Sequence, residues 1–338
     1  MFMDNPDDIR AHIEKFEDNI HKVELNDEYR KPLIKRTKMD FEDFIDFTTH
    51  SKITNKIYKL KTYMQLPDKE VEYKGIMYVF HGLQVHTNTH ANIAKEHAKL
   101  GIVSVGFDYR GHGLSEGTNG DVECFEELIS DAEYFILAVE NYFKSKFKDD
   151  NKENFEKNTQ FLNNRFCQGL SMGGLLSFFI ANRNKDKFKG VFFMAPAFAT
   201  PFFGCCQKII MNLFVPCFPL LQITDDNNPP LATKNLNEYE DKDPIIDKCK
   251  IKARSGYTML KYMDKAVDSF KEFSTPFLLI IPGIDKLVPP KIMIEFYEKS
   301  SSTDKTVLYY KNMWHAVTIE EEIWDVIDKS ITWLKKRL

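Results

Sequence analysis

The chain has 338 residues, of which 43% are hydrophobic and 13% aromatic, enough apolar material for a substantial core. Lysine and arginine (46) almost balance aspartate and glutamate (50), which leaves a formal net charge of -4. This balance argues against a nucleic-acid-binding protein, because such proteins normally gather a basic excess on one face.

The N-terminal stretch is polar and charge-rich, and we interpret residues 1–45 as an extension of one or two helices. The opening MFMDNPDDIR is acidic within a few residues and has no apolar run of the kind found in signal peptides. Six cysteines are scattered without a C-x-x-C pair, which favours reduced thiols. From these features we expect a cytoplasmic protein.

A regular rhythm of short apolar runs and helix-like segments follows a stretch at 52–66 whose alternation predicts an early hairpin. The runs are IMYVFHG (76–82), IVSVGFDY (102–109), RFCQGLS (165–171), GVFFMAP (190–196), FLLIIPG (277–283) and TVLYYKN (306–312). Strands that alternate with helices predict βαβ units and a mostly parallel sheet flanked by helices, that is, an α/β fold. We assign residues 46–198 and 271–338 to this core.

Two segments depart from the rhythm. The run KSKFKDDNKENFEKNTQ at 144–160 has little to bury and predicts a solvated loop or a helix that frays into one. Residues 199–270 lack strand patterning and are interpreted as an inserted helical cap. Its most apolar stretch, 205–223, is interrupted by lysine, asparagine and prolines, so we expect that it does not span a bilayer.

One pentapeptide carries a chemical signature. Gly169-Leu170-Ser171-Met172-Gly173 lies where an apolar strand gives way to the helix-like MGGLLSFFIANR. This is the G-x-S-x-G pattern of a nucleophile elbow, in which a sharp turn lifts the serine hydroxyl above the sheet. Ser171 is therefore the candidate nucleophile.

Candidate partners follow the last two predicted strands in chain order. Asp285 comes after FLLIIPG and His315 comes after TVLYY. Because the carboxyl ends of parallel strands face one crevice, we expect Ser171, Asp285 and His315 to meet there as a catalytic triad. His315 would act as general base and Asp285 would orient its imidazole.

A tetrahedral intermediate also needs N–H donors. We expect them from the backbone of Met172, directly after the nucleophile, and of Leu83, after the strand that ends in His81-Gly82. His86 and His90 have the spacing of two ligands on one helical face, but no carboxylate or cysteine nearby completes a set. We therefore expect no metal and no cofactor.

The motifs VFHGLQVHT, GFDYRGHGLSEG, GLSMGG, PGIDKLVPP and MWHAV together resemble the monoglyceride lipase and lysophospholipase-like branch of the serine α/β-hydrolases. The resemblance covers residues 45–338. It implies an α/β-hydrolase fold with a helical cap over an acyl-chain tunnel, and hydrolysis of single-chain fatty esters through an acyl-enzyme. It also implies transient peripheral contact of the cap with membranes, for which the apolar stretch offers Ile209, Leu213 and Phe214.

The chain departs from that branch where its members hold a glycerol head group with Glu, Arg and a second His. Here those positions are Val85, Thr89 and Thr318. We expect these three residues, and Ile209, Leu213 and Phe214 of the cap, to contact the substrate. The substrate therefore stays open between a monoacylglycerol, a lysophospholipid and a shorter acyl ester of a broad carboxylesterase.

Other functions on the same scaffold also stay open. The alternatives to the ester hydrolase keep the triad for acyl transfer, or for an aminopeptidase that uses Glu238, Glu240 and Asp241 for the substrate amine, although the mostly apolar cap argues against the aminopeptidase. A non-catalytic receptor is the alternative outside enzymes. Relatives that use an aspartate nucleophile are excluded by Ser171.

Overall fold

The apolar runs of the sequence form the parallel strands of one sheet. The strands are β5 (Gly75–Phe80), β6 (Ile102–Phe107), β7 (Arg165–Leu170), β8 (Gly190–Met194), β9 (Phe277–Pro282) and β10 (Lys305–Tyr310). The computed structural model describes residues 44–202, 211–223 and 250–338, the positions 232–233, 243 and 245–246 between them, and the backbone of Ile20–Lys22. Within these residues, the prediction of a mostly parallel sheet flanked by helices is confirmed.

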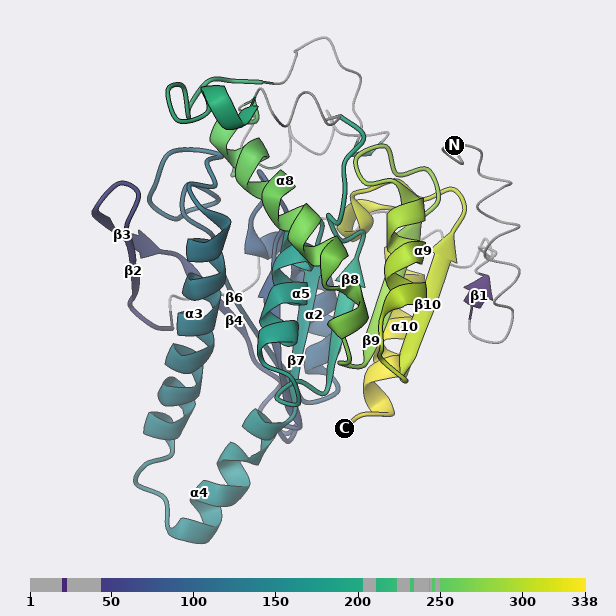
Figure 1. The fold of residues 1–338 in the computed structure, drawn as a ribbon. Helices are drawn as coiled ribbons and strands as arrows, with labels where there is room; N and C mark the ends of the chain where they lie inside the picture. The colour runs from purple at the N-terminus through teal and green to yellow at the C-terminus, as the bar shows by residue number, and fades with distance from the viewer. Residues whose placement is uncertain are drawn as a thin grey trace.

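The sheet has the order β1-β10-β9-β8-β7-β5-β6-β4 (Figure 1). β4 (Thr62–Gln65) closes one edge and runs antiparallel to β6. β1 (Ile20–Lys22) lies parallel to β10 at the other edge, where a helical extension was predicted; residues 1–19 and 23–43 lie outside the described residues. An early hairpin is present, but it begins before the predicted stretch 52–66, because its strands are β2 (Phe47–Ser51) and β3 (Lys56–Leu60).

Helices cover both faces of the sheet (Figure 1). Along β5, Tyr78 and Phe80 pack in the cluster that contains α3 (Phe125–Lys146), α5 (Met172–Arg183) and α9 (Pro290–Lys299). The alternate residues Met77 and Val79 pack in the cluster that contains α2 (Ala91–Ala98) and α10 (Ile323–Lys335). Because both faces are buried, the strands read as continuous apolar runs rather than as alternating ones.

The polar run at 144–160 is more helical than predicted. α3 continues to Lys146, and α4 (Lys152–Thr159) and the single turn η3 (Gln160–Asn163) follow it. α4 has no buried side chain and projects from the end of α3 (Figure 1). The helix forms because the Asn151 side chain accepts a hydrogen bond from the Asn154 N–H and caps its first turn.

The last helix of the insert, α8 (Ala253–Asp268), is attached to the core by hydrogen bonds. The hydroxyl of Ser255 accepts from Val122 N–H at 2.8 Å, and that of Thr258 accepts from Phe125 N–H at 3.0 Å. Arg254 forms a salt bridge with Asp121 beside them. α8 therefore packs against α3 and α5. Other short helical turns in the described residues include η2 (Thr87–His90), η4 (Phe270–Glu272) and η5 (Val317–Ile319).

Strand order determines which loops meet. β5 pairs with β6 on one side and with β7 on the other, so the direction of winding reverses at β5. Phe80 lies opposite Gly169 in this register, so the loop after β5 and the turn after β7 are neighbours. In open α/β sheets, ligands bind outside the carboxyl ends of the strands at such a switch point.

Candidate active site

The turn after β7 has the strained geometry of a nucleophile elbow. Ser171 has a φ of 54° and a ψ of -116°, in a region that L-residues rarely occupy. A Cβ added at Gly169 would overlap the carbonyl of Gly173, and one added at Gly173 would overlap the carbonyl of Phe80. The glycines are required because strand, turn and helix approach one another without room for a side chain.

His315 and Asp285 are joined in the loops after β10 and β9. His315 Nδ1 lies 2.6 Å from Asp285 Oδ2, and both residues are buried. A carboxylate can only accept, so His315 donates from Nδ1 and keeps the lone pair of Nε2 for a hydroxyl proton. This arrangement leaves His315 Nε2 able to accept a proton.

The carboxylate of Asp285 is itself held by the backbone. Its Oδ1 accepts hydrogen bonds from the N–H groups of Leu287 and Val288, each at 2.9 Å. The Ile284 N–H donates to the carbonyl of Met313 at 3.1 Å, which ties the aspartate loop to the histidine loop. Asp285 is thereby fixed at both oxygens.

The loop after β5 is held by a buried histidine. His81 Nδ1 donates to the carbonyl of Gly82 at 2.7 Å, and its Nε2 accepts from the Tyr109 N–H at 3.0 Å. Tyr109 also stacks on the ring and donates its hydroxyl to the His81 carbonyl. Burial, aided by His112, holds the pKa of His81 well below its usual value, so the ring is neutral. It therefore fixes the turn that carries Leu83.

A buried carboxylate after β6 joins the same loops. Asp108 accepts from Thr87 N–H at 2.8 Å, from Leu114 N–H at 2.9 Å and from the Tyr63 hydroxyl at 2.7 Å. Burial raises its pKa, and these hydrogen bonds oppose that rise. Sequence reasoning did not identify Asp108 or Tyr109 as supports of the site; the available signal was their position directly after an apolar strand.

These elements converge on one cavity of about 310 Å³, which Leu83, Ser171 and His315 line together. The backbone N–H of Met172 belongs to the first turn of α5, where helix donors have no partner within the helix. Most of the remaining lining is apolar and includes Ile246, Ile251, Met259, Leu260 and Met263 of the insert and Leu287 and Val288 of the core. The arrangement can add a serine to a carbonyl carbon in an apolar surrounding.

The predicted substrate contacts lie in different places. Val85 lines the cavity, whereas Thr89 and Thr318 are not among the lining residues in the described part of the chain. The hydroxyl of Thr89 donates to the carbonyl of His86 at 2.8 Å, and Thr318 is buried in η5. Leu213 and Phe214 lie on the surface, 70% and 57% exposed, and Ile209 lies outside the described residues.

The histidines after β5 have partners other than a metal. His86 Nε2 lies 2.8 Å from Asp243 Oδ2 and so joins the loop to the insert. His90 Nδ1 lies 3.3 Å from the side chain of Gln168 on β7. Across the described ranges, no group of three or more His, Cys, Asp or Glu side chains is placed to hold a metal ion.

Sequence reasoning missed the face of α8 that lines the cavity. Met259, Leu260 and Met263 lie on one side of this helix, at the i, i+1 and i+4 spacing of an amphipathic stripe. The spacing of these three residues in the sequence was the available signal. It indicates a buried face, but it does not distinguish packing on the core from lining a cavity.

Comparisons with known proteins agree with this geometry. An uncharacterised abhydrolase domain-containing protein of Dictyostelium discoideum is 27% identical over 266 residues, which are 77% of this chain but only 26% of that protein. The monoglyceride lipase of Rattus norvegicus is 25% identical over 272 residues, 78% of this chain and 84% of that one. The crystal structure of Paleococcus ferrophilus monoacylglycerol lipase has the same fold, with a TM-score of 0.68 and 21% identity over 82% of this chain and 99% of that one.

The predicted resemblance to the monoglyceride lipase-like α/β-hydrolases is thus confirmed. The family model described as "Serine aminopeptidase, S33" (Hydrolase_4) matches residues 71–322, which include the elbow and the loops that carry Asp285 and His315. The chain therefore belongs to this serine aminopeptidase S33 family of α/β-hydrolases.

Proposed function

We propose that this protein is a serine hydrolase that cleaves carboxylic esters of lipid-like substrates through an acyl-enzyme. The observation that carries the proposal is an apolar cavity lined both by the strained serine of the elbow and by a histidine that is hydrogen-bonded to a buried aspartate. Such a lining favours the binding of a long acyl chain, because the free energy falls when apolar surface leaves water.

In the proposed reaction, Ser171 Oγ attacks the ester carbonyl carbon while its proton passes to His315 Nε2. The N–H groups of Leu83 and Met172 stabilise the oxyanion that forms. The tetrahedral intermediate then expels the alcohol, which receives the proton from His315. Water attacks the acyl-enzyme by the same steps and releases the fatty acid.

The substrate class rests on the lining of the cavity. Among the described lining residues, His315 carries the only ionisable side chain. Gln84 and Thr200 have uncharged polar side chains that can hydrogen-bond to a head group. A neutral head group suits this lining better than a charged one, since a buried charge needs a partner. The rat relative named monoglyceride lipase supports the same choice.

The name of the family raises a second candidate, an aminopeptidase. A peptidase of this kind needs a carboxylate to hold the substrate amine, and none lines the cavity within the described part of the chain. The acidic residues considered for that role, Glu238, Glu240 and Asp241, lie outside the described residues. The apolar lining therefore favours the ester hydrolase.

A substrate panel tests the assignment. The panel comprises a monooleoylglycerol, a lysophosphatidylcholine, nitrophenyl esters from butyrate to palmitate and an alanine nitroanilide, each corrected with the Ser171→Ala variant. We expect turnover of the neutral esters and negligible turnover of the anilide. Turnover of the anilide alone would replace the esterase with the aminopeptidase.

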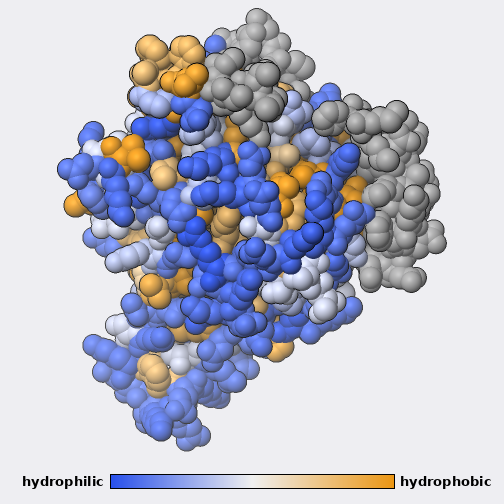
Figure 2. All heavy atoms as spheres, in the orientation of Figure 1, coloured by the Kyte–Doolittle hydropathy of each residue, from blue (hydrophilic) through white to orange (hydrophobic). Residues whose placement is uncertain are grey.

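We also propose that the insert contacts lipid surfaces. In the described segment 211–223, the large apolar side chains of Leu213, Phe214, Phe218, Leu220 and Leu221 are 48–70% exposed. Figure 2 shows apolar surface where Figure 1 draws the short helical turn above α8. No described helix is both long and apolar enough to cross a bilayer, so the contact is proposed to be interfacial.

Replacing Phe214 and Phe218 together by serine should weaken binding to phosphatidylcholine vesicles by about tenfold or more, because each ring contributes apolar area at the interface. Co-sedimentation with vesicles measures the effect. The matched control is Tyr134→Ser with Leu137→Ser, which removes two exposed apolar side chains from α3. Equal binding by the two double variants would contradict contact through segment 211–223.

A further inference from the structure

The hairpin of β2 and β3 presents a surface that the active site does not use. Residues 50–62 contain four lysines and neither aspartate nor glutamate, in a chain whose formal net charge is -4. Ile53 in the turn and Ile57 on β3 are 54% and 71% exposed. They lie between the tip lysines, Lys52 and Lys56, which are also exposed. The tip of the hairpin is therefore both apolar and cationic.

The pairing of the two strands explains why Ile57 faces solvent. Tyr58 and Leu60 alternate with it along β3 and are buried in the core. Ile57 lies opposite His50 in the register, on the outward face of the hairpin. An isoleucine on this face buries little of its apolar surface in the fold, so that surface remains available to a partner.

Nearby carboxylates do not neutralise the tip lysines. Lys59, farther along β3, pairs with Asp46 at 3.2 Å. Glu127 lies beside the turn of the hairpin, but its carboxylate pairs with Arg110 at 2.6 Å. Within the described residues, the ammonium groups of the tip lysines form no ion pair. Their charge is therefore available to an anionic partner.

The hairpin is joined to the apolar segment 211–223 of the insert. Glu123 accepts a hydrogen bond from the hydroxyl of Ser51 on β2. Arg254, at the start of α8, lies 3.7 Å from Glu123 and donates its backbone N–H to the carbonyl of Pro219 at 3.0 Å. Figure 1 draws the hairpin and the short helical turn above α8 on the same side of the molecule. A flat partner is therefore able to contact both surfaces at once.

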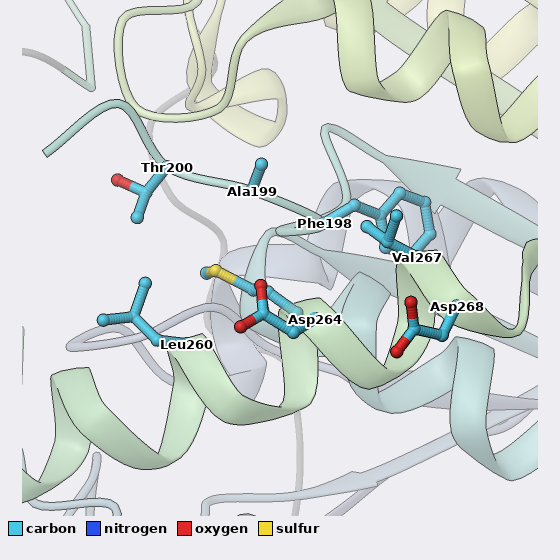
Figure 3. A pocket seen from close by; sticks show the side chains of 8 residues that line it. Phe198, Ala199, Thr200, Leu260, Asp264, Val267 and Asp268 are labelled. Carbon is cyan, nitrogen blue, oxygen red and sulfur yellow. The ribbon is translucent and has the colours of Figure 1, made fainter. Parts of the chain in front are cut away.

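A hollow at the other end of α8 has the opposite charge. It lies between α8 and the chain that follows β8 (Figure 3). Asp264 and Asp268 are exposed and are the charged residues among its described lining. Like charges repel, so an anionic surface meets the hairpin and the start of α8 rather than this hollow.

We propose that the tip lysines and the two exposed isoleucines of the hairpin bind the surface of a bilayer that contains anionic lipids. The isoleucines enter the headgroup region, and the ammonium groups lie at the level of the lipid phosphates. An acidic protein would also attract lysines, but exposed isoleucines favour a partner with an apolar interior. The proposal adds a charge-selective contact to the one proposed for segment 211–223, and it does not depend on the reaction at Ser171.

The test removes the charge and keeps the hairpin. Lys52→Gln with Lys56→Gln is compared with the unmodified protein by co-sedimentation with vesicles of phosphatidylcholine alone and of phosphatidylcholine mixed with phosphatidylserine. We expect binding to the mixed vesicles to weaken by about tenfold or more, and binding to phosphatidylcholine to stay unchanged. The matched control is Lys329→Gln with Lys335→Gln, which removes two exposed lysines from α10 on the other face of the sheet. Melting temperatures verify that the variants fold.

A second variant tests the apolar part of the contact. Ile53→Ser with Ile57→Ser should weaken binding to both kinds of vesicle, because it removes apolar area from the interface. Added salt should weaken only the part of the binding that depends on phosphatidylserine, since salt screens exposed charges.

The proposal is overturned if the lysine variant binds mixed vesicles as tightly as the unmodified protein, or if the α10 control loses as much binding. Equal binding of the unmodified protein to both kinds of vesicle would also overturn it, and would leave an acidic protein as the partner of the hairpin. Failure of the contact proposed for segment 211–223 differs from these outcomes. Phe214→Ser with Phe218→Ser would then bind phosphatidylcholine normally, while the lysine variant still lost its preference for phosphatidylserine.

Discussion

Replacing Ser171 with alanine should lower kcat for ester hydrolysis by about 10⁴ to 10⁶ without unfolding the protein. The loss is that large because no other hydroxyl among the residues that line the cavity stands on a strained elbow at a helix N-terminus. The methyl group of alanine occupies less space than the hydroxymethyl group, so the packing against β8 is kept. Steady-state kinetics on a monooleoylglycerol measures the effect, and the circular dichroism spectrum should be unchanged.

The control for this variant is Ser130→Ala on the exposed face of α3, where the hydroxyl bonds only to the carbonyl of Glu126. A fluorophosphonate probe should label the unmodified protein and Ser130→Ala, and should leave Ser171→Ala unlabelled. Substantial residual activity in Ser171→Ala would remove the serine from the mechanism. An unlabelled but folded parent protein would instead favour the non-catalytic receptor.

Changing Asp285 to asparagine should lower kcat by about 10⁴. The backbone N–H groups of Leu287 and Val288 both point at one oxygen of this side chain, so an asparagine would keep its oxygen there. Its NH₂ group would then face His315 Nδ1, which must become the acceptor. The ring proton would move to Nε2, and the histidine would lose the lone pair that takes the proton from Ser171.

The pH dependence of kcat distinguishes this effect from a general loss of structure. Asp285→Asn should retain its melting temperature and recover part of its activity at high pH, where hydroxide replaces the missing base. The matched control is Asp328→Asn on the exposed side of α10, which should keep full activity. Loss of folding in Asp285→Asn alone would mean that the carboxylate mainly holds the two loops together.

The sequence was sufficient for the core of the fold because its strands are buried on both faces. Runs such as 277–283 have no polar alternation, and this pattern with intervening helices specifies a parallel sheet. The nucleophile elbow could also be predicted from the sequence, because its geometry restricts the residues that fit there. Gly169 and Gly173 are the positions where a Cβ would strike the backbone, so the chain has little freedom to use other residues there.

Other features depend on contacts that spacing does not encode. Thr89 and Thr318 were expected to contact the substrate, but a threonine hydroxyl readily bonds to nearby backbone, as Thr89 does with His86. Tyr109 reaches His81 across a pair of adjacent strands, which only the sheet order reveals. The polar run at 144–160 looked like a loop because it buries nothing, yet Asn151 caps it as a helix.

The order of the strands along the chain has a consequence for synthesis. The elbow and its helix follow β7, whereas the proposed general base and its aspartate follow β10 and β9, which come later in the chain. Domains fold as units, so we expect a nascent chain that has completed β7 to carry Ser171 without its proposed partners. We therefore expect the proposed triad to be complete, and ester hydrolysis to begin, only when β9 and β10 have joined the sheet.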